Sequence, residues 1–180
     1  AALAASKKTG VPTAFILAIF AQETGSGKNL GTCVWSAPGV MREDNKRKDK
    51  TAFIAIMGEL GIAPESKAVS CPFGGGWGGA IGYTQFIPTT WLEQRTEAKG
   101  HLGHMPNPWK LEDSIMTSAV YLKRLGAVSD PRNAACKYYS GRSCDNKTPL
   151  NSFYGDQVMG KKLSLEKQIA ESIAKGEIKN

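Results

Sequence analysis

The sequence predicts one domain, residues 1–180, of the mainly α class, with long loops and little or no β-structure. Three observations support this prediction. Apolar residues recur at helical spacing over Thr13–Thr24; prolines and glycines recur where helices begin and end; and no pair of alternating apolar runs flanks a tight turn. Hydrophobic residues make up 41% and charged residues 22%, which is typical of a globular chain. The longest apolar run, Ala14–Ala21, is too short to span a bilayer.

The first three predicted helices are short, and each is followed by a glycine that ends it. They cover Ala1–Thr9, Thr13–Thr24 and Lys50–Leu60, before Gly10, Gly25 and Gly61. Pro12 stands just before the second helix, where a first-turn proline belongs. The segments 25–49 and 61–79 are expected to be long loops. The charge run REDNKRKDK that closes the first loop is interpreted as solvated surface, and only secondarily as a binding patch.

Four further helices are predicted in the second half, and three of them open with a proline in the first turn. They cover Ile87–Lys99, Leu111–Leu125, Asp130 to about Tyr139, and a C-terminal region after Pro149. Asp130-Pro131 and Thr148-Pro149 each combine an N-cap residue with such a proline. Residues 100–109 are expected to form a loop, and the last helical region is expected to break near Lys162–Ser164.

The charge balance predicts an anionic partner. Lys and Arg number 23 against 16 Asp and Glu, a formal net charge of +7. Such an excess suits nucleic acid, an acidic membrane surface or an acidic polymer such as bacterial cell wall. No zinc finger, RRM-like aromatic motif or basic helix accompanies the charge, so a nucleic-acid partner is not expected.

The four cysteines are expected to form two disulfides. They are Cys33, Cys71, Cys136 and Cys144. A zinc site is not expected, because no closely spaced C-x-x-C pair occurs and His101 and His104 lie in a predicted loop. Of the three possible pairings, proximity in sequence favours Cys136–Cys144 and leaves Cys33–Cys71. Two disulfides would indicate an oxidising compartment, and four reduced cysteines in a cytosolic protein are the alternative. No metal and no cofactor is expected.

One carboxylate stands out among the sixteen acidic residues. Glu23 follows Ile16, Ile19 and Phe20 at helical spacing, so it lies on the face that should be buried. It also lies in the last helical turn, where the helix dipole disfavours a negative charge. Burial and the dipole both raise the pKa of a carboxyl, as a general acid requires. Glu23 is therefore the candidate general acid, and an exposed residue at a frayed helix end is the alternative. The other fifteen acids are interpreted as solvated or as helix caps.

The second unusual stretch is Gly74 to Trp91, GGGWGGAIGYTQFIPTTW, which contains six glycines. Trp77 and Tyr83 offer flat faces for stacking, and Gln85 offers an amide donor and acceptor. The stretch lacks the Gly-Lys-Ser/Thr ending of a phosphate-binding loop. Aromatic planes with amide hydrogen bonds suit a sugar-binding cleft, and a glycine-rich turn with its aromatic residues in the core is the alternative.

These two stretches together resemble the lytic transglycosylases, nearest to the membrane-bound lytic transglycosylase B type of the lysozyme-like superfamily. The segment Leu17–Gly27, LAIFAQETGSG, resembles the helix that carries the catalytic Glu of that family. The segment Gly79–Trp91, GAIGYTQFIPTTW, resembles its Gly-Ala-Met-Gly-x-x-Gln-Phe-Met-Pro-Ser-Thr signature. Further blocks follow in the order of the family at residues 107–122, 137–141 and 154–158.

The resemblance implies a lysozyme-like fold and cleavage of peptidoglycan glycan strands between N-acetylmuramic acid and N-acetylglucosamine, with closure of a 1,6-anhydro ring. It implies that Glu23 is the single general acid and base. The residues expected to bind the substrate are Gln85, Tyr138, Tyr83, Trp77 and Tyr139. The protein is expected to be an exported monomer that acts in the periplasm, on the cell wall or outside the cell, with any export signal outside this sequence.

Three positions depart from the family pattern. Ser26 stands where the family often has an aromatic residue, Gly76 where some relatives have a substrate-binding serine, and Tyr139 where it has an asparagine. Two alternative functions therefore stay open, a muramidase that hydrolyses the same bond and a wall-binding module without activity. Glu112 and Asp113 are interpreted as caps at a helix start rather than as a second catalytic acid.

Overall fold

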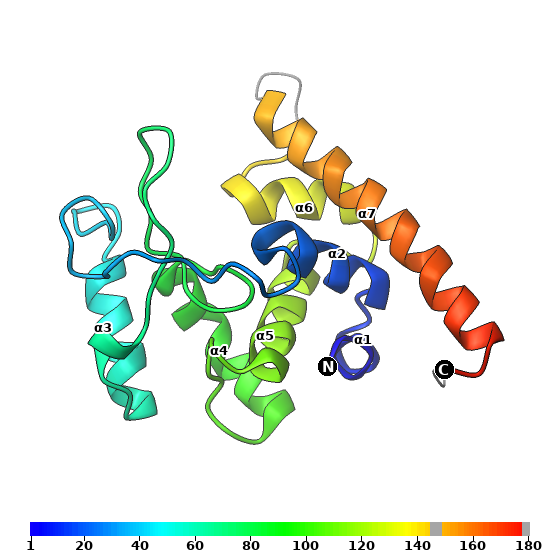
Figure 1. The fold of residues 1–180 in the computed structure, drawn as a ribbon, viewed down its shortest axis with the longest axis horizontal. Coiled ribbons are helices and arrows are strands. Elements are labelled where there is room, and N and C mark those ends of the chain that lie inside the picture. The colour runs from blue at the N-terminus through cyan, green and yellow to red at the C-terminus, as the bar shows by residue number, and fades with distance from the viewer. Residues whose placement is uncertain (145–148, 178–180) are drawn as a thin grey trace. The chain divides into compact units, whose positions relative to one another are not determined.

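The computed structural model describes residues 1–144 and 149–177, and this part of the chain is mainly α-helical. Its elements are α1 Ala2–Thr9, α2 Thr13–Thr24, α3 Asp49–Leu60, the 3-10 turn η1 Pro64–Ser66, α4 Pro88–Leu102, α5 Leu111–Arg124, α6 Pro131–Ser140 and α7 Pro149–Ala174 (Figure 1). The β-structure among these residues consists of three isolated bridges. The predicted fold class is therefore confirmed. No helix within the described ranges is both long enough and apolar enough to cross a membrane.

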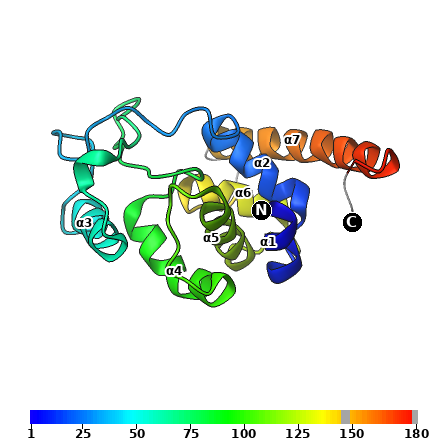
Figure 2. The same ribbon diagram turned by 60° about the horizontal axis from the view of Figure 1, so that its bottom comes forward.

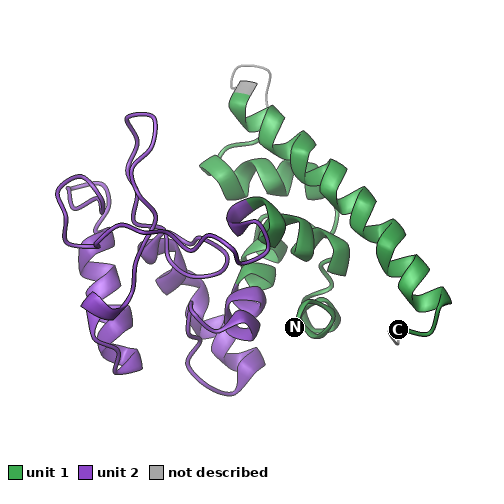
Figure 3. Cartoon of the chain, in the orientation of Figure 1, with its two compact units in different colours: residues 1–22, 118–180 green, residues 23–117 purple. Residues whose placement is uncertain are grey.

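The chain divides into two compact units (Figure 3). Unit 1 consists of residues 1–22 and 118–180, and unit 2 consists of residues 23–117. Each unit has its own buried side chains, so each is described by itself. That residues 1–180 act as a single functional domain stays a prediction.

The core of unit 1 includes buried side chains of α2 and the packed pair α6 and α7. Phe15, Ile16 and Ile19 of α2 are fully buried, as the helical spacing predicts. Helix α6 packs against α7, and Figure 2 shows the two helices in the same part of the unit. The Cys136–Cys144 disulfide lies where they meet, because an added Cβ at Gly155 of α7 would be 2.6 Å from the sulfur of Cys136.

The core of unit 2 lies between α3 and α4, and two long loops cover it. Phe53 of α3 and Trp91 of α4 are fully buried. Within the first loop, the backbone of Cys33 pairs with Val69 of the second loop through two hydrogen bonds of 3.0 Å. The Cys33–Cys71 disulfide joins the same two loops, with 5.1 Å between the Cα atoms. Both predicted disulfides are present: Cys33–Cys71 joins two loops, and Cys136–Cys144 joins α6 to the segment that follows it.

Two predicted helix boundaries are wrong. Helix α4 continues past Lys99 to Leu102, and Gly103 ends it in a left-handed conformation while its N–H donates to the carbonyl of Lys99. Helix α7 does not break near Lys162–Ser164, and a Lys162–Glu166 ion pair one turn apart spans that point. Thr148, the predicted N-cap of α7, lies outside the described residues.

The charge run at residues 42–50 is only partly solvated surface. Arg42 binds Asp44 in a partly buried ion pair of 2.6 Å, and this hydrogen bond lowers the pKa of Asp44 to about 2. Asp49, by contrast, is buried, where it pairs with Arg47 and accepts a 2.7 Å hydrogen bond from the hydroxyl of Thr89. The interpretation as solvated surface is wrong for Asp49, whose carboxylate joins the start of α3 to the start of α4.

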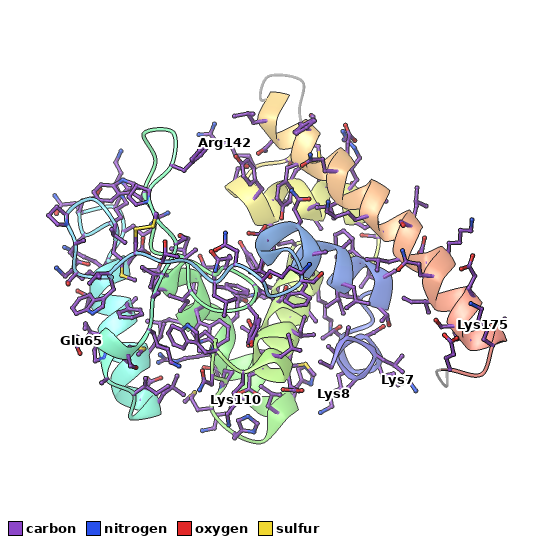
Figure 4. All side chains as sticks on the ribbon, in the orientation of Figure 1. Lys7, Lys8, Glu65, Lys110, Arg142 and Lys175 are labelled. Carbon is purple, nitrogen blue, oxygen red and sulfur yellow. A yellow bond between two sulfur atoms is a disulfide. The ribbon has the colours of Figure 1, made fainter. Side chains whose placement is uncertain are left out.

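Other charges do face solvent, as the net charge of the chain suggests. Lys7, Lys8 and Lys175 of unit 1 are exposed, and Figure 4 shows their side chains directed away from the ribbon. Lysines of this kind attract anionic surfaces without contributing to the packing of the fold.

Candidate functional site

Glu23 is the second-last residue of α2 and the first residue of unit 2. Its side chain is partly exposed rather than fully buried. The backbone that follows it is held in place by the buried Thr24, whose hydroxyl donates to the carbonyl of Tyr83 at 3.2 Å and accepts from the N–H of Gly27 at 2.8 Å. Because these bonds fix the turn after the helix, the position of the Glu23 backbone is well defined.

Glu23 lines a pocket of about 270 Å³ in unit 2. The other lining residues are Asn29, Gly31, Thr32, Ser70, Cys71, Pro72, Phe73 and Gln85. The structure thus brings together the carboxyl of the first unusual stretch and the amide of the second, which are far apart in sequence. Of the described residues that line this pocket, Glu23 is the only ionisable one, since Cys71 is in a disulfide.

Gln85 reaches the pocket through an uncommon backbone conformation. Its φ of 50° lies in the left-handed region, which costs a residue other than glycine about 1–2 kcal/mol. A tight turn from Ile81 to Phe86, closed by hydrogen bonds of 2.8 and 3.2 Å between the two residues, holds this conformation. The side-chain nitrogen of Gln85 also donates to the carbonyl of Gly82 at 2.9 Å. Backbone strain of this kind is concentrated at functional sites.

The turn requires a glycine at position 82. Its φ is 68°, and an added Cβ would clash with the carbonyl of Pro108. The N–H of Tyr83 donates to that same carbonyl at 3.1 Å. The loop that carries Gln85 is therefore packed directly on the backbone before α5, which limits its movement.

A second pocket, of about 480 Å³, shares Pro72 and Phe73 with the first. Trp77 lines this second pocket and not the Glu23 pocket, with half of its surface exposed. Phe73 lines both pockets and was not among the predicted site residues. The available signal was a large aromatic residue within a predicted loop, between the Cys71-Pro72 pair and the glycine run.

Three other predicted substrate-binding residues lie elsewhere. Tyr83 is partly buried and is not among the residues that line either of the two pockets. Tyr138 and Tyr139 belong to unit 1, where the Tyr138 ring is 5.5 Å from that of Tyr121 and the Tyr139 ring stacks on Tyr154 at 4.7 Å. A role for these three residues in binding the substrate stays a prediction.

Asp113 was predicted to be a helix cap, and it also holds the loop before α5. It is buried in the first turn of α5, accepts a 2.9 Å hydrogen bond from the N–H of Asn107, and pairs with His104 at 2.9 Å. Its carboxylate therefore fixes the loop before α5 and does not line the Glu23 pocket.

The chain belongs to the Transglycosylase SLT domain family, whose sequence profile matches residues 2–157. No curated protein matches the chain in sequence. Among solved structures, soluble lytic transglycosylase SltB1 from Pseudomonas aeruginosa is 29% identical, with a TM-score of 0.54 over 69% of this chain and 42% of that one. A 36 kDa muramidase/transglycosylase is 25% identical, with a TM-score of 0.53 over 68% of this chain and 39% of that one.

A third structure, catenated lytic transglycosylase SltB1 from Pseudomonas aeruginosa, covers more of the chain. It is 19% identical, has a TM-score of 0.60 and covers 91% of this chain and 73% of that one, which shows a shared fold. The chain spans about two fifths of the length of the first two structures. The resemblance to lytic transglycosylases is thereby confirmed.

Proposed function

We propose that this chain is a peptidoglycan lytic transglycosylase that uses Glu23 as its single general acid and base. The observation that carries the proposal is that Glu23 and Gln85 line one pocket, in a chain that belongs to the Transglycosylase SLT domain family. A partly exposed carboxyl in a 270 Å³ pocket, beside an amide, is able to contact a sugar and protonate it. The bond cleaved would be the β-1,4 bond from N-acetylmuramic acid to N-acetylglucosamine.

The reaction requires two proton transfers, one from Glu23 and one back to it. Protonated Glu23 gives its proton to the glycosidic oxygen, the bond from that oxygen to C1 of the muramic sugar breaks, and the N-acetylglucosamine side leaves as an alcohol. The substrate's own N-acetyl group stabilises the positive charge at C1. The Glu23 carboxylate then takes the proton of the 6-hydroxyl as its oxygen bonds to C1, which closes the anhydro ring and restores the acid.

The amide of Gln85 is suited to hold the N-acetyl group. Its side-chain nitrogen donates a hydrogen bond to the carbonyl of Gly82, which fixes the side chain before the substrate binds. Because the attacking hydroxyl belongs to the substrate, no second carboxylate is needed to position a water. A hydrolase normally uses two carboxyl groups, and Glu23 is the only acidic residue among the described residues that line this pocket.

The test is mass spectrometry of the products from purified peptidoglycan. We expect muropeptides lighter by one water than those that a hydrolase releases. Glu23→Gln should keep the fold and lower the rate at least about 100-fold, because it removes the proton donor. Glu65→Gln, in the exposed turn η1, is the matched control and should keep full activity. Products with ordinary reducing ends would instead identify a muramidase, and near-normal turnover by Glu23→Gln would contradict the role of Glu23.

The partner and the location follow from the same proposal. Peptidoglycan lies outside the cytoplasm, and the two disulfides agree with an exported protein. The excess of positive charge would favour adsorption to an anionic wall. We expect the protein to act as a monomer.

A further inference from the structure

The loop from Pro72 to Gly79 presents two aromatic side chains to solvent next to the Glu23 pocket. Phe73 is 92% exposed and Trp77 is 50% exposed. Figure 1 shows this segment as a narrow loop that stands out from the helices of unit 2. Large apolar side chains give up the stabilisation of burial when they are exposed, so two of them on one short loop indicate a binding surface.

The base of this loop is fixed, although its tip is exposed. The N–H of Gly79 donates to the carbonyl of Ser70 at 2.8 Å, and the N–H of Ser70 donates to Ala80 at 3.0 Å. The Cys33–Cys71 disulfide ties the same end to the neighbouring loop. An added Cβ at Gly78 would clash with the backbone of residues 70–72, so the two sides of the loop are in close contact. The two ends of the loop that carries the aromatic rings are thus held together before a ligand binds, which lowers the entropic cost of binding.

The pocket beneath these rings continues from the Glu23 pocket. Both are lined by Pro72 and Phe73, so the two pockets are neighbours and a polymer in the first is within reach of the second. Each of the eight described residues that line the second pocket is a glycine, a proline or an aromatic residue. The stem peptides of peptidoglycan carry carboxylate and amino groups, which would find no opposite charge on these side chains. Uncharged sugar rings, with apolar C–H faces, suit the surface better.

We propose that Phe73 and Trp77 form an additional glycan-binding subsite, which takes an uncharged N-acetylhexosamine ring further along the strand than the ring held at Glu23. The inference rests on the proposed function in one respect, since it places the glycan strand in the Glu23 pocket. It adds a substrate preference: longer strands should bind more tightly than short ones, because only they reach both pockets.

The experiment measures binding apart from catalysis. Phe73→Ala and Trp77→Ala are each made in the Glu23→Gln protein, and oligomers of two and six β-1,4-linked N-acetylglucosamine units are titrated by calorimetry. Loss of either ring should weaken binding of the six-sugar oligomer roughly 3- to 10-fold. Trp77→Ala should leave the two-sugar oligomer unchanged, whereas Phe73→Ala should also weaken that oligomer, because Phe73 lines both pockets. Ile54→Ala, an exposed apolar residue on α3, is the matched control and should change neither value. Circular dichroism checks that each variant is folded.

Three results would overturn the subsite. The first is equal binding of the six-sugar oligomer by the Glu23→Gln protein and both ring variants. The second is no binding of that oligomer by the Glu23→Gln protein. The third is an effect of the ring variants that occurs only with muropeptides that carry stem peptides. The last result would identify a peptide site. Turnover of peptidoglycan by the wild-type protein is measured separately. If binding depends on the rings but no anhydro products form, the proposed reaction alone is refuted. If anhydro products form but binding does not depend on the rings, the subsite alone is refuted.

Discussion

Replacing Cys33 and Cys71 with alanine should destabilise unit 2 strongly. The bond closes a loop with a sequence separation of 38 residues, and both loops that it joins lack regular secondary structure. Constraining an unfolded chain at this separation is worth about 4 kcal/mol. The Cys136–Cys144 bond has a separation of 8 residues, for which the same relation gives about 2.5 kcal/mol. The longer loop should therefore show the larger effect.

Tryptophan fluorescence is the appropriate probe, because all four tryptophans lie between Trp35 and Trp109, within unit 2. Urea unfolding followed by fluorescence should give a free energy of unfolding about 4 kcal/mol lower in Cys33→Ala/Cys71→Ala than in the wild type. The alanine pair in unit 1 serves as the control. A loss of under about 1 kcal/mol, or a smaller loss than in the control, would refute the argument from loop closure. Because Cys71 also lines the Glu23 pocket, the same variant in the Glu23→Gln background should bind glycan less tightly.

Two further predictions concern local backbone and charge. Gly82→Ala should destabilise unit 2 by more than about 1 kcal/mol, since its Cβ would clash with Pro108. Gly100→Ala, in α4 with open space around it, should stabilise unit 2 by about 0.5–1 kcal/mol. Thermal unfolding that reversed these signs would contradict both assignments. Asp44 has a pKa lowered to about 2 from an unfolded value of 3.8, so its stabilising contribution is complete above pH 3.8 and is lost as the pH falls toward 2. Arg42→Ala removes the main cause and should return this pKa toward 3.8 in a carbon-13 NMR titration, and an unchanged value would show that Arg42 is not that cause.

The helices were predictable because their signals are local. Thr13–Thr24 has the predicted bounds, and the side chain of Asp130 accepts from the N–H of Asn133 as the N-cap pattern implies. The error at the end of α4 has an identifiable cause. Gly100 and Gly103 look alike in sequence, and only the left-handed conformation of Gly103 shows which of them ends α4.

The loops were not predictable in the same way, because their order comes from contacts between distant segments. Asp49 and Asp113 appear in polar sequence and were interpreted as surface and cap, yet both are buried. Asp49 accepts a hydrogen bond from Thr89 of α4, and Asp113 accepts one from the loop residue Asn107. Phe73 produces no periodic pattern, so its exposure in the shared wall of two pockets is visible only in the folded chain.

The features that cost stability in unit 2 lie around the pockets. Gln85 has a left-handed backbone that glycine would adopt more easily, and Phe73 and Trp77 expose apolar surface that burial would stabilise. Each cost has a nearby compensation: the hydrogen bond from Gln85 to Gly82, and the disulfide and backbone bonds at the base of the aromatic loop. A fold selected for stability alone has no reason to retain these paired costs and compensations. Their concentration around the two pockets, which share Phe73, is the expected pattern if one glycan strand occupies both pockets.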